Sequence, residues 1–373
     1  MKVVAELIED CGEVAAGDEF FRSRPFLDAE EVTHTLRIEG ATAAGDQVAL
    51  VAPLIVRDIP DCDLRDAISP YGYPGLTSAL ERSSSRYASE TAFERARGGA
   101  TGRAVPGGAT RAAALDPGEI DWGGTGLVSL FIRHALGSPP LTGARPRNVV
   151  QIADPELPPK RRPSDRNQIN RNRRAGYEMR IVPGPETTAA ERAGFLAAYE
   201  QTMRRTGAAP RYFFGAAWFD RVLESPQAWL ALAHAPSGEV AAASIAVRSD
   251  GFLHYYLSGS ADSHLRDSPM KNVVAALVDF AADLALPLNL GGGISPGDRL
   301  EEFKRGFANR EQPWHTSEIV CDPETYDRLS TGCKKSDFFP LYRSAGVRGQ
   351  ADQGRRESDE GSAQFGARPE EGD

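Results

Sequence analysis

The sequence has few cysteines and no long hydrophobic run. Its four cysteines, Cys11, Cys62, Cys321 and Cys333, are scattered over 373 residues, which argues against a disulfide framework and against a zinc-binding cluster. No window approaches the roughly 18 apolar residues of a membrane span, and the first residues lack the apolar core of a signal peptide. We therefore expect a cytoplasmic protein with free thiols and no membrane span.

The chain also lacks an excess of positive charge. Lysine and arginine together number 43 and aspartate and glutamate 52, so the net charge at pH 7 is −9. A bulk attraction to DNA or to an anionic membrane is therefore not expected. An anionic partner would have to be bound by a local basic patch.

Signatures of common cofactor sites are absent as well. There is no P-loop, no dinucleotide-binding fingerprint and no His/Cys cluster with metal-ligand spacing, so neither a metal nor a bound cofactor is expected. None of the histidines adjoins a nucleophile motif such as G-x-S-x-G, which favours structural or exposed positions for all of them. They are His34, His134, His234, His254, His264 and His315.

The length predicts either two compact lobes or one lobe with tails, because a single hydrophobic core rarely serves more than roughly 250 to 300 residues. We expect an N-terminal lobe over residues 1–150 that contains a loose loop at 77–118, rich in Ser, Arg, Ala and Gly. A proline-rich linker at 151–165 leads to a C-terminal lobe at 166–345. The polar tail, 346–373, has too few apolar residues to become ordered.

The C-terminal lobe has the clearest periodicity. Thr188 is predicted to cap an amphipathic helix that ends at Thr206. Ser268 and Pro269 predict the start of a second helix, and a strand is expected at 286–290. Between the helices, three apolar segments have the turns of an antiparallel meander; they are 229–233, 240–247 and 252–257. In an α/β fold with mixed sheets, this order is typical of acyltransferases of the GNAT type.

The segment GGGISPGDRLEEFKRGF, residues 291–307, is the strongest candidate for a chemical site. Ser295 and Asp298 predict that a helix begins at the SPGD sequence. On this helix Lys304 shares one stripe with three apolar residues, Leu300, Phe303 and Phe307. An unpaired ammonium costs several kcal/mol to bury. Lys304 therefore either faces a substrate cleft or extends its long stem to solvent.

Two other segments are candidates for substrate binding. In SPYGYPG the prolines and glycines hold Tyr71 and Tyr73 at a loop tip, where the phenols either line a pocket or simply pack. Residues 160–174 carry seven basic residues against one acid, which suits either an RNA phosphate track or a solvated linker. The basic residues are Lys160, Arg161, Arg162, Arg166, Arg171, Arg173 and Arg174, and Arg204, Arg205 and Arg211 extend the patch if they lie nearby.

Several segments taken together resemble the Fem family of aminoacyltransferases and its GNAT-like relatives in actinobacteria. They are SPYGYPG, GLVSLFIRH, NQINRNRRAGYEMRI, FLAAYEQTMRR with RYFF, HYYLSGS, NLGGG and RLEEFKRGF. The resemblance covers most of residues 20–343. It implies two GNAT-like lobes, the first of them degenerate, and an active centre that contains Phe303 and Lys304.

The resemblance implies that an aminoacyl-tRNA gives its amino acid to an amine of a peptidoglycan precursor or of a peptide-like antibiotic. Such an ester is already activated, so no nucleophilic Ser or Cys is required. Lys304 would stabilise the developing oxyanion or the leaving ribose oxygen. The side chains expected to orient substrate are Tyr71, Tyr73, Arg211, Tyr212, Tyr255 and Tyr256.

Two alternative functions are compatible with the sequence. An acyl-coenzyme A transferase of the same fold would need a pyrophosphate loop, whose Arg/Gln-x-x-Gly-x-Gly/Ala pattern is missing from SGSADSHLRDSPMKN. A non-catalytic RNA-binding module would use the basic segment 160–174 alone.

Overall fold

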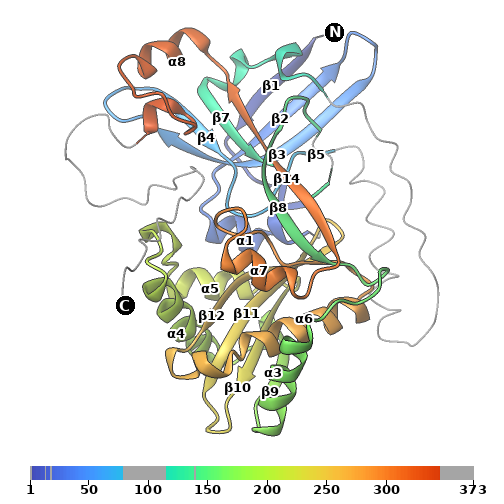
Figure 1. The fold of residues 1–373 in the computed structure, drawn as a ribbon. Helices are drawn as coiled ribbons and strands as arrows, with labels where there is room; N and C mark the ends of the chain where they lie inside the picture. Colours follow the sequence, from blue (N-terminus) through green and yellow to red (C-terminus); the bar gives the residue numbers. More distant parts are fainter. Residues whose placement is uncertain (1, 13, 17–18, 79–114, 138–139, 345–373) are drawn as a thin grey trace. The chain divides into compact units, whose positions relative to one another are not determined.

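The computed structural model describes residues 2–12, 14–16, 19–78, 115–137 and 140–344 (Figure 1). The chain divides into two compact units, which are described separately. Unit 1 consists of residues 1–17, 32–145 and 316–329, and unit 2 of residues 18–31, 146–315 and 330–373. The expected tail, 346–373, and residues 79–114 of the expected loose loop lie outside the described residues.

The division differs from the single linker expected at 151–165. Residues 18–31 belong to unit 2, and residues 316–329 belong to unit 1. The first residues of the expected linker are the end of strand β8 (Arg145–Ala153), and its last residues begin helix α3 (Pro163–Arg174). Residues 151–153 are therefore not part of a linker. Ile152 is buried, and its strand β8 pairs with β13 (Leu288–Asn289) inside unit 2.

Unit 1 is built on a mixed set of strands. In sheet order the strands are β6 (Ile120–Asp121), β1 (Val3–Ile8), β2 (His34–Ala41), β3 (Gln47–Asp58), β4 (Arg65–Ile68), β7 (Leu127–Arg133) and the second half of β14 (Arg310–Val320), with β5 (Thr77–Ser78) beside β3. Most neighbouring strands are antiparallel, but β1 and β6 are parallel, as are β4 and β7. Helix α8 (Pro323–Ser330) follows β14.

Unit 2 contains a mixed sheet in the order β8-β13-β12-β11-β10-β9. Its strands are β9 (Glu178–Pro183), β10 (Ala228–His234), β11 (Val240–Ser249), β12 (Phe252–Ser260) and β13 (Leu288–Asn289), in addition to β8. Strands β10, β11 and β12 form the predicted antiparallel meander, whereas β12 and β13 are parallel. The two-residue turn between β11 and β12 is Asp250-Gly251; both residues have positive φ, as the twist of a tight hairpin requires.

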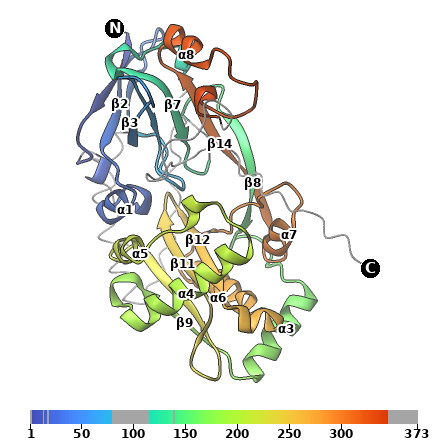
Figure 2. The ribbon, with the colours of Figure 1, turned by 90° about the vertical axis from the view of Figure 1, so that its left-hand side faces the viewer.

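Helices cover this sheet in two pairs (Figure 2). Helices α4 (Ala189–Arg205) and α5 (Ala216–Leu223) contact each other, and α4 lies on β11 and β12. Helices α6 (Met270–Asp283) and α3 form the other pair, and α6 packs on β10 and β11. The other α-helices in the described part of unit 2 are α1 (Arg24–Ala29) and α7 (Arg299–Arg305). None of the helices among the described residues combines the length and the apolar composition of a membrane span.

The helix starts agree with the sequence in one case and differ in another. Thr188 caps α4 as predicted, and Glu191 completes a reciprocal capping box. Ser268, by contrast, does not cap α6: it is left-handed, its hydroxyl donates to the Leu265 carbonyl, and Pro269 occupies the cap position.

We expect Thr188→Ala to lower the free energy of unfolding by about 1 kcal/mol, because the Glu191 N–H then loses the hydroxyl that accepts its hydrogen bond. Thr188→Ser keeps this acceptor and should cost less than half as much. Denaturant unfolding of both variants measures the difference. Equal losses in the two variants would mean that the cap contributes nothing.

Candidate active site

The candidate site lies next to the point where the pairing between strands β12 and β13 ends. Leu253 pairs with Leu288 and His254 pairs with Asn289; β13 then ends, while β12 continues to Ser260. The register of β11 against β12 also shifts at this level, so that no β11 residue lies opposite Tyr256. Such a bulge re-aims side chains locally. The glycine turn, residues 291–293, follows the end of β13 after one intervening residue.

Two asparagines hold the glycine turn. The Asn289 side-chain oxygen accepts a hydrogen bond from the Gly291 N–H at 2.8 Å, and the Asn148 side chain donates to the Gly293 carbonyl at 2.9 Å. Gly291 has φ of +75°, and a Cβ on Gly292 would lie 2.3 Å from the Asn148 amide nitrogen. Glycine is therefore required at these two positions.

Helix α7 begins at Arg299, and not at the SPGD serine as the sequence suggested. Asp298 is the cap: its carboxylate accepts from the Glu301 N–H at 2.7 Å and also from the N–H groups of Ile294 and Ser295 at 2.6 and 3.0 Å. Burial raises the pKa of Asp298, but these backbone donors outweigh it, and the net pKa is lowered. The carboxylate thus ties the turn to the helix.

Lys304 points inward, as its place in the apolar stripe predicted. The residue is 8% exposed, and its Nζ donates to the Gly292 carbonyl at 2.6 Å. Burial lowers the pKa of Lys304 to about 8, opposed by the charge of Asp298. Among the described residues no carboxylate lies within ion-pair distance of Nζ, so an ammonium with three donors has one protein acceptor.

The three apolar residues that were predicted to share a stripe with Lys304 do not all face inward. Leu300 is 38% exposed, which corrects the expectation that it faces inward. The rings of Phe303 and Phe307 lie 5.7 Å apart, and both belong to the apolar core of α6, where Tyr255 also packs. The Tyr255 hydroxyl donates to Ser258 at 2.6 Å, and burial raises its pKa to about 12.

The other predicted substrate-binding residues are not members of this core. Tyr256 belongs to an aromatic cluster with Phe20, Phe21 and Trp218. Arg211 and Tyr212 form their own pair on a short turn after α4, with the guanidinium 4.9 Å from the ring centroid. Tyr71 and Tyr73 belong to unit 1. Of the six, only Tyr255 shares a core with Phe303.

The basic segment lies largely on helix α3. One face of the helix is buried and contains Asp165, Ile169 and Asn172. Arg161 and Arg162 have partners: Arg161 pairs with Asp279 at 3.5 Å, and Arg162 donates to the Glu302 carbonyl at 3.0 Å. The other five basic residues are exposed and have no ion pair among the described residues; they are Lys160, Arg166, Arg171, Arg173 and Arg174.

The buried face of α3 hydrogen-bonds the start of α6. Gln168 and Asn172 both donate to the Asp267 carbonyl, at 3.0 and 2.8 Å. Asp165, which is 6% exposed, pairs with Lys271 in the first turn of α6 at 2.9 Å. A carboxylate therefore already neutralises the cation at this helix start.

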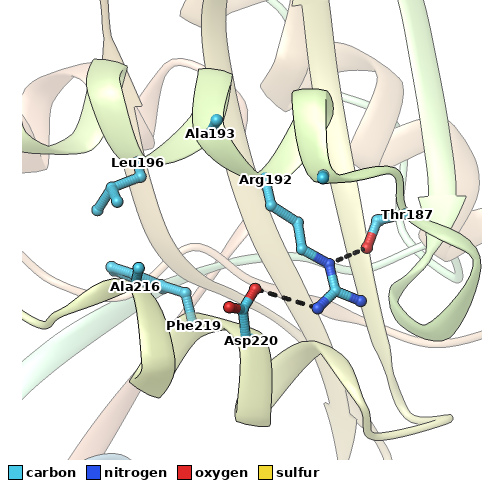
Figure 3. A pocket seen from close by; sticks show the side chains of 8 residues that line it. Thr187, Arg192, Ala193, Leu196, Ala216, Phe219 and Asp220 are labelled. Carbon is cyan, nitrogen blue, oxygen red and sulfur yellow. Dashed lines mark hydrogen bonds and ion pairs between the residues drawn. The ribbon is translucent and has the colours of Figure 1, made fainter.

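A surface pocket of about 480 Å³ lies elsewhere in unit 2, between α4 and α5 (Figure 3). Arg192 crosses it and binds Thr187 at 2.8 Å and Asp220 at 3.1 Å. Its other lining residues are mainly apolar: Ala189, Ala193, Leu196, Ala216 and Phe219. No residue predicted for the site lines this pocket, and the polar groups in it satisfy one another.

Sequence patterns did not single out Asn148, Asn289 or His254. Asn289 lies two residues before the first of the three glycines, which is a local signal that a side chain could hold the turn. Asn148 lies 145 residues from its partner Gly293, so no local pattern reveals their contact.

Burial of Lys304 should make the free energy of unfolding depend on pH. The fold disfavours its charged form, so the penalty is present below pH 8 and disappears as the pH rises from about 8 toward the ordinary value of 10.5. Relative to Lys304→Met, the native protein should gain about 3 kcal/mol of unfolding free energy across this interval. Urea unfolding of both proteins at several pH values provides the test; parallel curves would contradict it.

Comparison with known proteins agrees with this architecture. Residues 159–305 match the family described as the Acetyltransferase (GNAT) domain. The crystal structure of FemX superposes with a TM-score of 0.54, covering 87% of this chain and 99% of FemX at 11% identity. The C-terminal domain of a putative lysylphosphatidylglycerol synthetase from Agrobacterium fabrum gives 0.46, covering 84% of this chain and 90% of its own at 13% identity. No curated protein matches in sequence. The protein is an acyltransferase with a mixed α/β, GNAT-like fold.

Proposed function

We propose that the protein transfers an amino acid from aminoacyl-tRNA to the amine of a small molecule or peptide, either a peptidoglycan precursor or a peptide-like secondary metabolite. The observation that carries this proposal is the buried ammonium of Lys304, which has one protein acceptor and lies beside the glycine turn where β12 and β13 part. Use of aminoacyl-tRNA implies that the reaction takes place in the cytoplasm.

The chemistry needs little more than orientation and charge. A neutral amine attacks the ester carbonyl, a C–N bond forms, and the carbonyl oxygen becomes an oxyanion. The C–O bond to the ribose then breaks, and the proton of the amine passes to the ribose oxygen. Lys304 stabilises the negative oxygen with an N–H that the protein leaves unused, in a site where water does not screen the charge.

Two features of unit 2 support a tRNA donor. Arg166 and Arg173 lie seven residues apart on the exposed face of α3, where they are free to neutralise phosphates. At the start of α6, where a GNAT-type enzyme would bind the pyrophosphate of coenzyme A, Asp165 already pairs with Lys271. A second anion there would meet the Asp165 carboxylate. If the protein transferred an acyl group from acyl-coenzyme A and not from aminoacyl-tRNA, the proposal of a tRNA donor would be wrong.

Replacing Lys304 by Met removes the charge and keeps the length of the side chain. We expect turnover with aminoacyl-tRNA to fall by about 100- to 1000-fold, because one electrostatic donor to the oxyanion is lost. Mass spectrometry of the new amide, with and without ribonuclease, measures the transfer. The control is Lys334→Met, which removes an exposed lysine. Unaltered turnover in Lys304→Met would remove this residue from the mechanism.

Replacing both Arg166 and Arg173 by Gln tests the donor surface. Two phosphate contacts would be lost, so the slope of log affinity for tRNA against log salt should decrease by about 2 while turnover at saturation persists. The matched control is Arg221→Gln, because Arg221 is already paired with Glu224. An unchanged salt slope in the double variant would exclude α3 from the RNA contact.

A further inference from the structure

A buried network of polar side chains begins in the N-terminal segment of unit 2. The guanidinium of Arg22, a residue only 6% exposed, donates to both carboxylate oxygens of Asp250, at 2.6 and 3.2 Å. The backbone N–H of Asp250 donates to Glu19 at 2.5 Å, and the Ser249 hydroxyl donates to the Asp250 carboxylate at 2.9 Å. These bonds fix the turn between β11 and β12.

His254 continues the network into the sheet. Its Nε2 lies 3.1 Å from the Ser249 carbonyl, which can only accept, so Nε2 carries the proton. Nδ1 is then the acceptor for the Asn289 side-chain amide at 3.0 Å. Burial lowers the pKa of His254 to about 4 and keeps the ring neutral. Phe21 packs edge-on against the ring, with centroids 5.2 Å apart.

The orientation of the Asn289 amide follows from this tautomer. Its nitrogen is committed to His254, so its oxygen faces the Gly291 N–H at 2.8 Å. If the amide were reversed, it would present donors to the Gly291 N–H and an oxygen to the lone pair of His254. The histidine therefore fixes the amide, and the amide fixes the first residue of the glycine turn.

We propose that His254 and Asn289 are positioning residues, which hold the Gly291–Gly292 turn so that its carbonyl places the ammonium of Lys304. The inference rests on the function proposed for Lys304. Glycines have no side chains to hold such a turn, so its shape depends on the bonds that it makes. Asn289 binds the N–H of Gly291, and the next residue, Gly292, is the one whose carbonyl accepts the hydrogen bond from Nζ of Lys304.

A consequence is that a buried amide on β13 controls the protonation of a lysine on α7. If the turn is released, the Gly292 carbonyl moves away, water reaches Nζ, and the pKa of Lys304 rises toward its ordinary value. Asn289 hydrogen-bonds His254 and Gly291, so none of the charged groups around α7 loses a partner when it is replaced. These groups are Asp298, Arg299, Glu301, Glu302 and Arg305 on or beside the helix, Arg162 and Asp165 facing its C-terminal end, and Glu311 on β14; Asp250 is the charge that acts on His254.

The test measures the titration of Lys304 in the absence of substrate. The chain contains only six lysines, so in protein labelled with ¹³C- and ¹⁵N-lysine the Cε signal of Lys304 is identified by its loss in Lys304→Met. In Asn289→Ala we expect its midpoint to rise from about 8 by at least about one pH unit. The alkaline limb of the turnover profile should move by the same amount, and turnover should fall roughly 10- to 100-fold.

Two variants and one control separate positioning from a general loss of stability. His254→Phe keeps the ring packing and removes the acceptor of the Asn289 amide, so it should shift the Lys304 titration in the same direction. Asn289→Asp keeps an oxygen for the Gly291 N–H but has no donor for His254 Nδ1, so its turnover should lie between that of Asn289→Ala and that of the native protein. The control, Asn272→Ala, removes an equally buried amide on α6 and should leave the titration unchanged.

The outcomes of this test are distinct. An unshifted Lys304 titration in folded Asn289→Ala or His254→Phe would overturn the positioning role, and so would an equal shift in Asn272→Ala. If the titration shifts as expected but Lys304→Met retains full turnover, the positioning role holds and the proposed function of Lys304 fails.

Discussion

The contact between the Lys304 ammonium and the Gly292 carbonyl is the constraint on which the site depends. A buried cation is tolerated only where acceptors replace water, and the protein supplies one acceptor at 2.6 Å. Burial lowers the pKa of Lys304 to about 8, and the single protein acceptor leaves N–H groups of the ammonium available. Such a group is well suited to an oxygen that becomes negative only during the reaction, because its hydrogen bond is then strongest in the transition state.

The surrounding structure is arranged to maintain this contact. Asp298 caps α7 and at the same time binds two N–H groups of the preceding turn, so one carboxylate connects the helix to the turn. Strand β13 ends after two paired residues, which releases the chain into the glycine turn beside the longer β12. The cost is a buried charge that destabilises the native state near neutral pH, as is common where a site is built for function.

The sequence predicted the regular part of unit 2 well, because its signals are local. The Thr188 cap and the meander of β10 to β12 follow from short-range patterns that the final packing does not override. The site was predicted only in part. The helical spacing of Lys304 indicated that it faces inward, but Leu300 on the same stripe is exposed, because α7 is short and that side of its first turn is uncovered. The residues that hold the turn come from distant strands, and no pattern within one segment could bring Asn148 to Gly293.

The proposed reaction is most directly tested by a crystal structure with an adenosine that carries an aminoacyl group through a hydrolysis-resistant amide. The account predicts that the Lys304 Nζ lies within hydrogen-bond distance of the acyl carbonyl oxygen or of the ribose atom that replaces the leaving oxygen. An acyl group bound elsewhere, with the ammonium still held by Gly292 alone, would contradict it.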